Sequence, residues 1–157
     1  MIAATHIIFG AGCSVVFADI IGLDTFQATL VVAAGMMGSL LPDIDHPGST
    51  FGRSIRPLSD IISFVFGHRG ITHSLFMIAS LIALLTHYNN APIWSYGMVI
   101  GYFSHLLGDW LTPSGIPLLW PVKRKFRAPI TVRTGGIFEM MIGASVLGIG
   151  FAWYLTK

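Results

Sequence analysis

Histidine and aspartate concentrate in three short segments of the chain. Residues 67–74 (Gly-His-Arg-Gly-Ile-Thr-His-Ser) lie where a polar segment leads into an apolar one. They stand between residues 43–46 (Asp-Ile-Asp-His) and residues 104–109 (Ser-His-Leu-Leu-Gly-Asp). Neutral imidazole is a common metal ligand and proton carrier, and a divalent cation also needs deprotonated carboxylates. If the three segments meet in the fold, they predict a metal site.

The spacing within these segments suits a shared ion. His105 and Asp109 are four residues apart, so they lie on one face of a helix. Asp43 and Asp45 are two residues apart between two prolines, and both can point at one ion if their segment is extended. A mixed set of His and Asp ligands favours zinc, with manganese or iron as alternatives.

The candidate ligands outnumber the positions around one ion. His68 and His73 are separated by a glycine-containing turn that can bring the two rings together. The full set of candidates is His6, Asp43, Asp45, His68, His73, His105 and Asp109. Either two ions bind, or some of these residues support the ligands or act in catalysis. His46 and Glu139 are the candidate general bases, and Arg69 could stabilise developing negative charge.

The composition is that of an integral membrane protein. Hydrophobic residues make up 54% of the chain and charged residues only 10%, against roughly 25% in a soluble domain. Such a chain has no broad basic surface for nucleic acid. Its one cysteine excludes an internal disulfide and a zinc site built from cysteines. We expect one integral-membrane domain over residues 1–157 that contacts membrane lipids.

Five apolar stretches are long enough, or nearly long enough, to cross a bilayer. They cover residues 2–21, 26–41, 71–88, 94–111 and 136–155. The first has neither a basic leader nor a clear cleavage site, so we interpret it as a retained helix. The predicted fold is an all-α polytopic membrane bundle of about five spanning helices.

The connections between these stretches predict the topology. Of the nine Lys and Arg side chains, three lie in residues 48–70 and five in residues 112–135. With five spans, both basic segments fall on one side of the membrane, which the positive-inside rule assigns to the cytoplasm. The N-terminus is then cytoplasmic and the C-terminus lies outside. In this topology the candidate ligands form one layer near the cytoplasmic ends of the helices.

The two basic segments differ in predicted structure. In the first, apolar residues recur at helical spacing from Phe51 to Phe66, which predicts an amphipathic helix in the membrane interface that begins near Pro57. The second contains four prolines, which forbid a long helix. Its basic residues 123–127 face either anionic headgroups or a phosphate-bearing substrate.

Each candidate site residue also has a purely structural interpretation. These alternatives are a cap or a local hydrogen bond for His6 and Asp43, a local turn for Asp45 and His46, an interfacial position for His68, a core position for His73, a metal-free pair of His105 and Asp109, a salt bridge from Glu139 to Arg69 or Arg133, and a positive-inside anchor for Arg69. Against them stands the cost of placing several ionisable groups in a bilayer, where such groups usually mark functional sites.

The longer motifs resemble the YdjM-like family. They are residues 40–47 (Leu-Leu-Pro-Asp-Ile-Asp-His-Pro), 66–74 (Phe-Gly-His-Arg-Gly-Ile-Thr-His-Ser) and 101–113 (Gly-Tyr-Phe-Ser-His-Leu-Leu-Gly-Asp-Trp-Leu-Thr-Pro). Residues 5–6, 117–121 and 126–129 are similar as well, so the resemblance covers most of the chain. It implies a metal-dependent hydrolase of the bacterial inner membrane, expressed under LexA control in the SOS response to DNA damage.

These observations predict a membrane-embedded, metal-dependent hydrolase with its site at the cytoplasmic face. The depth of the site favours a lipid-like or amphiphilic substrate, which could carry a phosphoester. Two other classes of function stay open: a membrane protein that binds or transports a metal ion or protons, and a non-catalytic regulatory membrane subunit. The polar groups gather at one face only, whereas a conduit needs polar sites across the bilayer.

Overall fold

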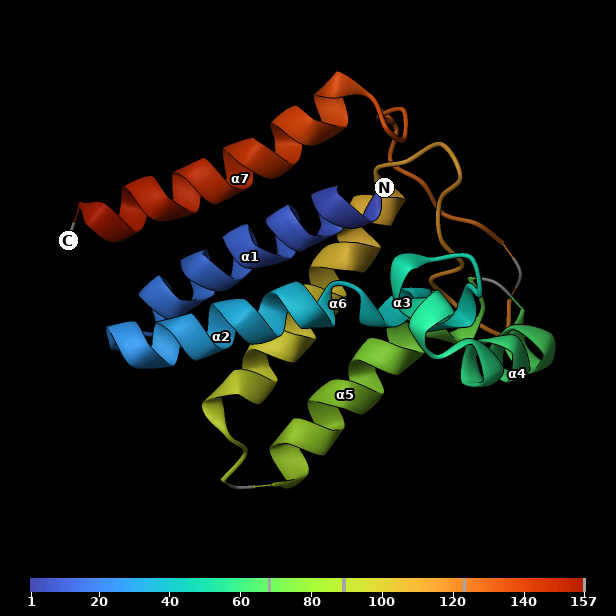
Figure 1. Cartoon of the computed structure of the whole chain (residues 1–157), viewed down its shortest axis with the longest axis horizontal. Helices are drawn as coiled ribbons and strands as arrows, with labels where there is room; N and C mark the ends of the chain where they lie inside the picture. Colours follow the sequence, from blue (N-terminus) through green and yellow to red (C-terminus); the bar gives the residue numbers. More distant parts are fainter. Residues whose placement is uncertain (68, 89, 123, 157) are drawn as a thin grey trace.

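The fold is all-helical, and its longer helices match the five apolar stretches. The structure is a computed structural model that describes residues 1–67, 69–88, 90–122 and 124–156. The longer helices in Figure 1 are α1 (Ala3–Ile20), α2 (Thr25–Gly38), α5 (Leu75–His87), α6 (Ile93–Trp110) and α7 (Ile137–Leu155). The predicted all-α membrane bundle is therefore confirmed.

Three segments of the described chain have the length and composition of membrane spans. They are Ala3–Ile20, Thr25–Asp45 and Ile137–Leu155. Helix α5 is apolar but has only 13 residues. Helix α6 has 18 residues, but two of them are the ionisable His105 and Asp109. The predicted number of five spans is thus only roughly supported.

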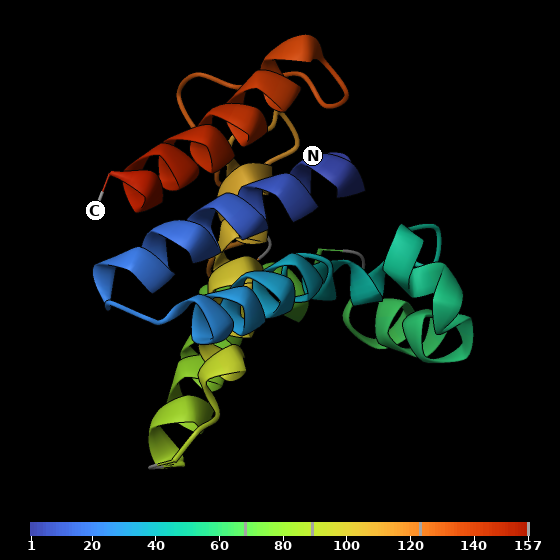
Figure 2. The same cartoon turned by 60° about the vertical axis from the view of Figure 1, so that its left-hand side comes forward.

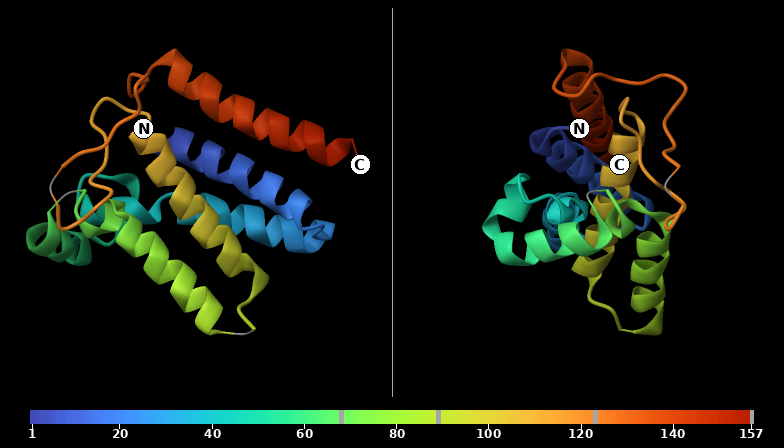
Figure 3. Two further views of the ribbon diagram at one scale, coloured as in Figure 1. Left: turned by 180° about the vertical axis from the view of Figure 1, so that it is seen from behind. Right: turned by 90° about the vertical axis from the view of Figure 1, so that its right-hand side faces the viewer.

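The helices lie side by side and give the bundle two unlike ends. Helix α1 lies between α7 and α2 (Figures 1 and 2), α6 crosses behind them, and α5 contacts α6 (Figure 3). The N-terminus, residues 41–74 and residues 112–135 gather at one end, which we term the polar end. The α1–α2 turn and the C-terminus lie at the other end (Figure 1). Both basic segments therefore lie at the same end of the bundle.

Polar side chains are buried and many apolar ones are exposed, the reverse of a soluble protein. His6, His105 and Asp109 are at most 1% exposed, whereas Phe26 is 72% and Ile137 71% exposed. In a bilayer, lipid covers exposed apolar side chains, and ionisable groups face the bundle interior. The bundle thus encloses its polar groups rather than a purely apolar core.

Helices α2 and α6 pack at a distance that only glycine permits. A Cβ atom on Gly97 would lie 2.2 Å from the carbonyl oxygen of Val31, and one on Gly101 would lie 2.0 Å from that of Gly35. Small residues allow membrane helices to approach this closely. The contact brings the second half of α6, which carries His105, against the end of α2.

The interfacial helix predicted for the first basic segment is present in two pieces, α3 (Thr50–Ser54) and α4 (Arg56–Phe66). Pro57 lies in the first turn of α4, as expected from its fixed φ. Helix α4 buries Ser59 against the protein and exposes 91% of Phe64. An exposed apolar face on a helix at the polar end agrees with the predicted interfacial position.

The connections beside these helices refine the sequence predictions. Leu41–Asp45 forms a 3-10 helix, η1, and Ile71–His73 forms another, η2, so α5 begins at Leu75 and not at residue 71. The segment around Asp43 is not extended, which was the condition for Asp43 and Asp45 to point at one ion, because Pro42 at the start of η1 favours a helical φ. With three residues per turn, residues two apart point in different directions. The described residues of 112–135 contain no helix, as the prolines predicted.

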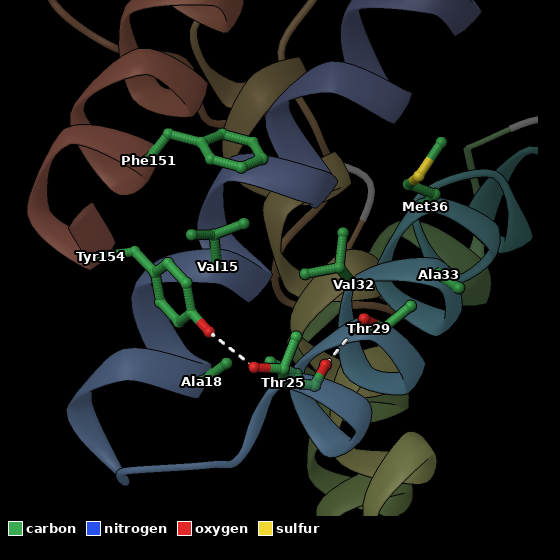
Figure 4. Close-up of a pocket in the computed structure, with 10 residues that line it drawn as sticks. Val15, Ala18, Thr25, Thr29, Val32, Ala33, Met36, Phe151 and Tyr154 are labelled. Atoms are coloured by element: carbon green, nitrogen blue, oxygen red, sulfur yellow. Dashed lines mark hydrogen bonds between the residues drawn. The ribbon is translucent and has the colours of Figure 1, made fainter.

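The end of the bundle opposite the polar end is apolar. There α1, α2 and α7 line a partly open cavity of about 370 Å³ (Figure 4). The hydroxyls of Thr25 and Tyr154 meet across it at 3.4 Å. Its lining residues include neither histidine nor a carboxylate. The chemistry predicted from the sequence therefore belongs to the polar end.

Candidate metal centre

Four donor atoms face one another at the polar end. The Nε2 atoms of His73 and His105 lie 3.9 and 3.7 Å from Oδ1 of Asp43. The same two nitrogens lie 3.9 and 4.0 Å from Oδ2 of Asp109. We term these four residues the central quartet. Because η1, η2 and α6 supply them, the three segments singled out in the sequence do meet.

His6 brings a fourth element, α1, to this site. Its ring stacks on that of His105 with centroids 3.7 Å apart and planes 11° apart. Its Nε2 lies 3.3 Å from Oδ1 of Asp109. His6, His105 and Asp109 form one group whose donor atoms could hold an ion, and Asp43, His73 and His105 form another. The two groups overlap at His105.

The centre is buried except at one residue. The side chains of His73 and His105 are 0% exposed and that of Asp109 is 1% exposed, whereas Asp43 keeps 22%. A buried carboxylate is costly unless cations or hydrogen-bond donors compensate it. Asp109 has such partners, because Nη2 of Arg69 lies 2.7 Å from its Oδ2 and the Met1 amino group contacts its Oδ1.

A backbone carbonyl sets the orientation of His105. Nδ1 of this ring lies 2.6 Å from the carbonyl oxygen of Ser39, at the end of α2. Because a carbonyl only accepts, Nδ1 carries the proton, and the lone pair of Nε2 faces the quartet. Within the described residues, that buried Nε2 has no hydrogen-bond partner. An oriented imidazole lone pair that points at two carboxylates fits a metal ion.

Asp45 lies behind His73 rather than at the centre of the quartet. Its Oδ2 accepts the Thr72 hydroxyl and the backbone N–H of Arg69, the latter at 2.9 Å, and lies 3.4 Å from Nδ1 of His73. A carboxylate on the outer nitrogen of a histidine orients the ring and raises its basicity toward a metal. The structure therefore brings Asp45 to the site but separates it from Asp43.

Arg69 points inward from a strained backbone. Its φ is 58°, in the left-handed region, which costs a bulky residue on the order of 1 kcal/mol. Besides Asp109, its guanidinium contacts the Ser114 hydroxyl at 2.6 Å and the Gly115 carbonyl at 3.1 Å. Only 18% of the side chain is exposed. The strain is held by the N–H bond to Asp45, so one carboxylate positions both the arginine and a histidine.

Comparison with known proteins now places the chain. A family model described as YdjM inner membrane protein matches residues 1–156. The chain belongs to the YdjM family. It is 42% identical over 147 residues to the inner membrane protein YdjM of Escherichia coli K12 and equally to that of Shigella flexneri, over 87% of this chain and 74% of each relative.

A more distant relative comes from another bacterium. The chain is 36% identical over 146 residues to the uncharacterized protein YvsG of Bacillus subtilis 168, over 93% of this chain and 89% of that one. No solved structure matches it. The resemblance seen in the motifs is thus confirmed. Together with its apolar helices, membership of the YdjM family supports an inner membrane location.

Two predicted site residues of this YdjM-family chain, His46 and Glu139, do not belong to the quartet, and a third is not among the described residues. His46 is exposed, and its backbone N–H donates to the carbonyl of Asp43. Glu139 is fully buried, and its two oxygens accept the N–H groups of Ile2 and Gly135, each at 2.8 Å. It therefore ties the start of α1 to the start of α7. His68 lies outside the described residues.

Sequence reasoning missed three residues that support the site. Ser39 acts through its main-chain carbonyl, which leaves no trace in the sequence. Thr72 bonds to Asp45, and the Tyr102 hydroxyl donates to the Thr72 carbonyl. Tyr102 precedes His105 by three residues on the same helix face, so helical spacing could have pointed to it.

Proposed function

We propose that this YdjM-family protein is a metal-dependent hydrolase whose metal site is the central quartet. The observation that carries the proposal is the convergence of two imidazole nitrogens and two carboxylate oxygens in a buried site, at 3.7–4.0 Å. Ligands around a tetrahedral zinc lie roughly 3.3–3.5 Å apart, so these four nitrogen–oxygen pairs are slightly wider than in a formed site. Zinc is the favoured ion, with manganese or iron as alternatives.

Residues of the chain have distinct parts in this proposal. Asp43, His73, His105 and Asp109 hold the ion, and His6 would serve a second one. A bound ion supplies Lewis-acid polarisation and lowers the pKa of water. Arg69, beside Asp109, is placed to bind the anionic part of a substrate and to stabilise negative charge that develops on it.

The proposal also assigns roles to residues outside the quartet and names a substrate class. Asp45 keeps the His73 ring oriented. His46 and Glu139 stay candidate general bases, although neither lies in the quartet. The substrate class that suits the location is a lipid-like or amphiphilic ester, including phosphoesters. The same proposal places the N-terminus and the site on the cytoplasmic side. LexA control of expression stays a prediction from the family resemblance.

Metal analysis of the purified protein tests the proposal most directly. We expect the wild-type chain to hold zinc, manganese or iron, and His105→Ala and Asp109→Asn to lose it. His87→Ala and Asp60→Asn are matched controls, because both residues lie outside the ligand groups. The same five proteins are then assayed on lipid phosphoesters and carboxylic esters, where only the wild type and the controls should hydrolyse a substrate.

Two results would contradict the proposal. A wild-type protein that holds no metal, and that added Zn²⁺ or Mn²⁺ does not stabilise, would favour the regulatory subunit. Metal retention and ion movement in sealed vesicles, without hydrolysis of any ester, would favour a metal-binding or transport protein.

A further inference from the structure

The polar end holds a second cavity next to the metal centre. Its volume is about 530 Å³, and its walls come from the end of α4 and from the connection between α6 and α7. Arg69 lines this cavity and also reaches Asp109 with Nη2, at 2.7 Å. The cavity and the central quartet therefore meet at one arginine.

The charge of the cavity wall is positive. Its lining residues include two cations, Arg69 and Lys125, and no carboxylate. The guanidinium of Arg69 is held by Asp109, the Ser114 hydroxyl and the Gly115 carbonyl, whereas Lys125 is exposed at the cavity wall. Lys and Arg together are a common combination for phosphate, which accepts several charge-assisted hydrogen bonds.

The rest of the wall is apolar and aromatic. Phe66 and Trp120 both line it, with ring centroids 6.3 Å apart, and Trp120 also contacts Phe76 outside the cavity, at 6.4 Å. Next to this wall, α4 exposes 61% of Ile61 and 91% of Phe64. Aromatic and apolar side chains at the end of a membrane bundle lie at the depth of lipid headgroups and of the first acyl carbons.

We propose that this cavity binds the phosphate-bearing headgroup of an anionic lipid. Lys125 and Arg69 bind the phosphate, and the first part of the acyl chain lies along Phe66 and Trp120. The inference rests on the proposed function, because it names the substrate class of that site. The aromatic wall and the exposed face of α4 favour a membrane lipid over a soluble phosphate ester, which needs no apolar wall.

A binding experiment tests the cavity without requiring hydrolysis. The full chain in detergent, with a chelator present, is titrated with dioctanoyl phosphatidic acid, dioctanoylglycerol and glycerol 3-phosphate, and bound ligand is counted by native mass spectrometry. We expect phosphatidic acid to bind about tenfold more tightly than either of the other two. Lys125→Gln should weaken that binding by about tenfold, and Lys125→Arg should restore it.

Arg124→Gln is the matched control. Arg124 is the neighbouring residue and has the same charge, but it lies over the Phe126 ring and does not line the cavity. Its loss should change phosphatidic acid binding by less than about twofold. Equal losses in Lys125→Gln and Arg124→Gln would overturn the inference, because they indicate general surface charge. Equally tight binding of glycerol 3-phosphate would overturn the choice of a lipid.

The two proposals can fail separately. Lys125-dependent lipid binding by a protein that hydrolyses nothing supports the cavity and refutes the hydrolase. If the protein hydrolyses a substrate but Lys125→Gln binds phosphatidic acid as tightly as the wild type, only the lipid-binding proposal is refuted.

Discussion

At the scale of single residues, the site depends on what lies behind each histidine. The Ser39 carbonyl contacts Nδ1 of His105. Nδ1 of His73 contacts the Thr72 hydroxyl at 3.1 Å, and that hydroxyl donates to Asp45, so both Nε2 atoms face the same two carboxylates. Such partners fix the tautomer and the ring orientation of a metal-binding histidine. The sequence predicts Asp45 as a ligand, because the spacing of two aspartates carries no information about which of them faces the centre.

Replacing Asp45 distinguishes a residue that orients a metal ligand from a residue that binds the metal directly. Asp45→Asn keeps the shape of the side chain but weakens its contacts with Thr72 and His73. We expect the variant to bind the same number of ions as the wild type with about 10- to 100-fold lower affinity. Asp43→Asn removes a proposed ligand and should lower the number of bound ions itself. Competition with a chromogenic chelator measures both quantities.

The opposite result would assign Asp45 to the metal itself. If Asp45→Asn and Asp43→Asn lose metal to the same extent, Asp45 is a direct ligand, as the sequence alone suggested. Asp60→Asn is the control, because Asp60 is exposed on α4 and pairs only loosely with Arg56, at 3.8 Å.

At the scale of elements, the apolar stretches and the amphipathic pattern predict most of the fold. The five long helices and the helix after Pro57 follow from hydropathy and helical spacing. Hydropathy and helical spacing do not predict the break between α3 and α4 at Ile55, nor the turns η1 and η2. Each of these depends on how the backbone packs at the polar end. Those turns place Asp43 and His73, so the sequence predicts which residues meet but not their arrangement.

The close contact between α2 and α6 positions His105. Adding a methyl group at this contact tests whether the position of His105 depends on it. Gly101→Ala places a Cβ where the Gly35 carbonyl oxygen lies 2.0 Å away, so the helices must separate. We expect this variant to lose about 1–3 kcal/mol of stability, because overpacking strains a close contact. Its metal affinity should fall as well, since His105 then moves away from the Ser39 carbonyl. Thermal unfolding in detergent and chelator competition measure the two effects.

Gly148→Ala is the matched control for this prediction. A Cβ on Gly148 in α7 meets no atom within 4 Å, so the added methyl group should leave both stability and metal affinity unchanged. A Gly101→Ala protein as stable as Gly148→Ala would show that α6 does not depend on the close approach to α2.

At the scale of the whole molecule, polarity is separated along the bundle. The metal centre has buried histidines and carboxylates, and it lies at the polar end with the cationic cavity. Both basic segments lie at the same end (Figure 1), whereas the cavity at the other end is apolar (Figure 4). The distribution of Lys and Arg in the sequence predicts this, because two basic segments separated by an even number of spans must lie on one side. Which side of the membrane they face is a separate question of topology.

Cysteine labelling in spheroplasts addresses that question. With Cys13 replaced by alanine, Asn90→Cys and Thr131→Cys each give a chain with one cysteine, at exposed positions in the α5–α6 connection and in the α6–α7 connection respectively. If the positive-inside rule holds, a membrane-impermeant maleimide labels Asn90→Cys in intact spheroplasts and labels Thr131→Cys only after lysis. Labelling of both after lysis confirms that each thiol is reactive. The reverse pattern would place the metal centre and the lipid cavity at the outer face, so their substrate would come from the outer leaflet of the inner membrane.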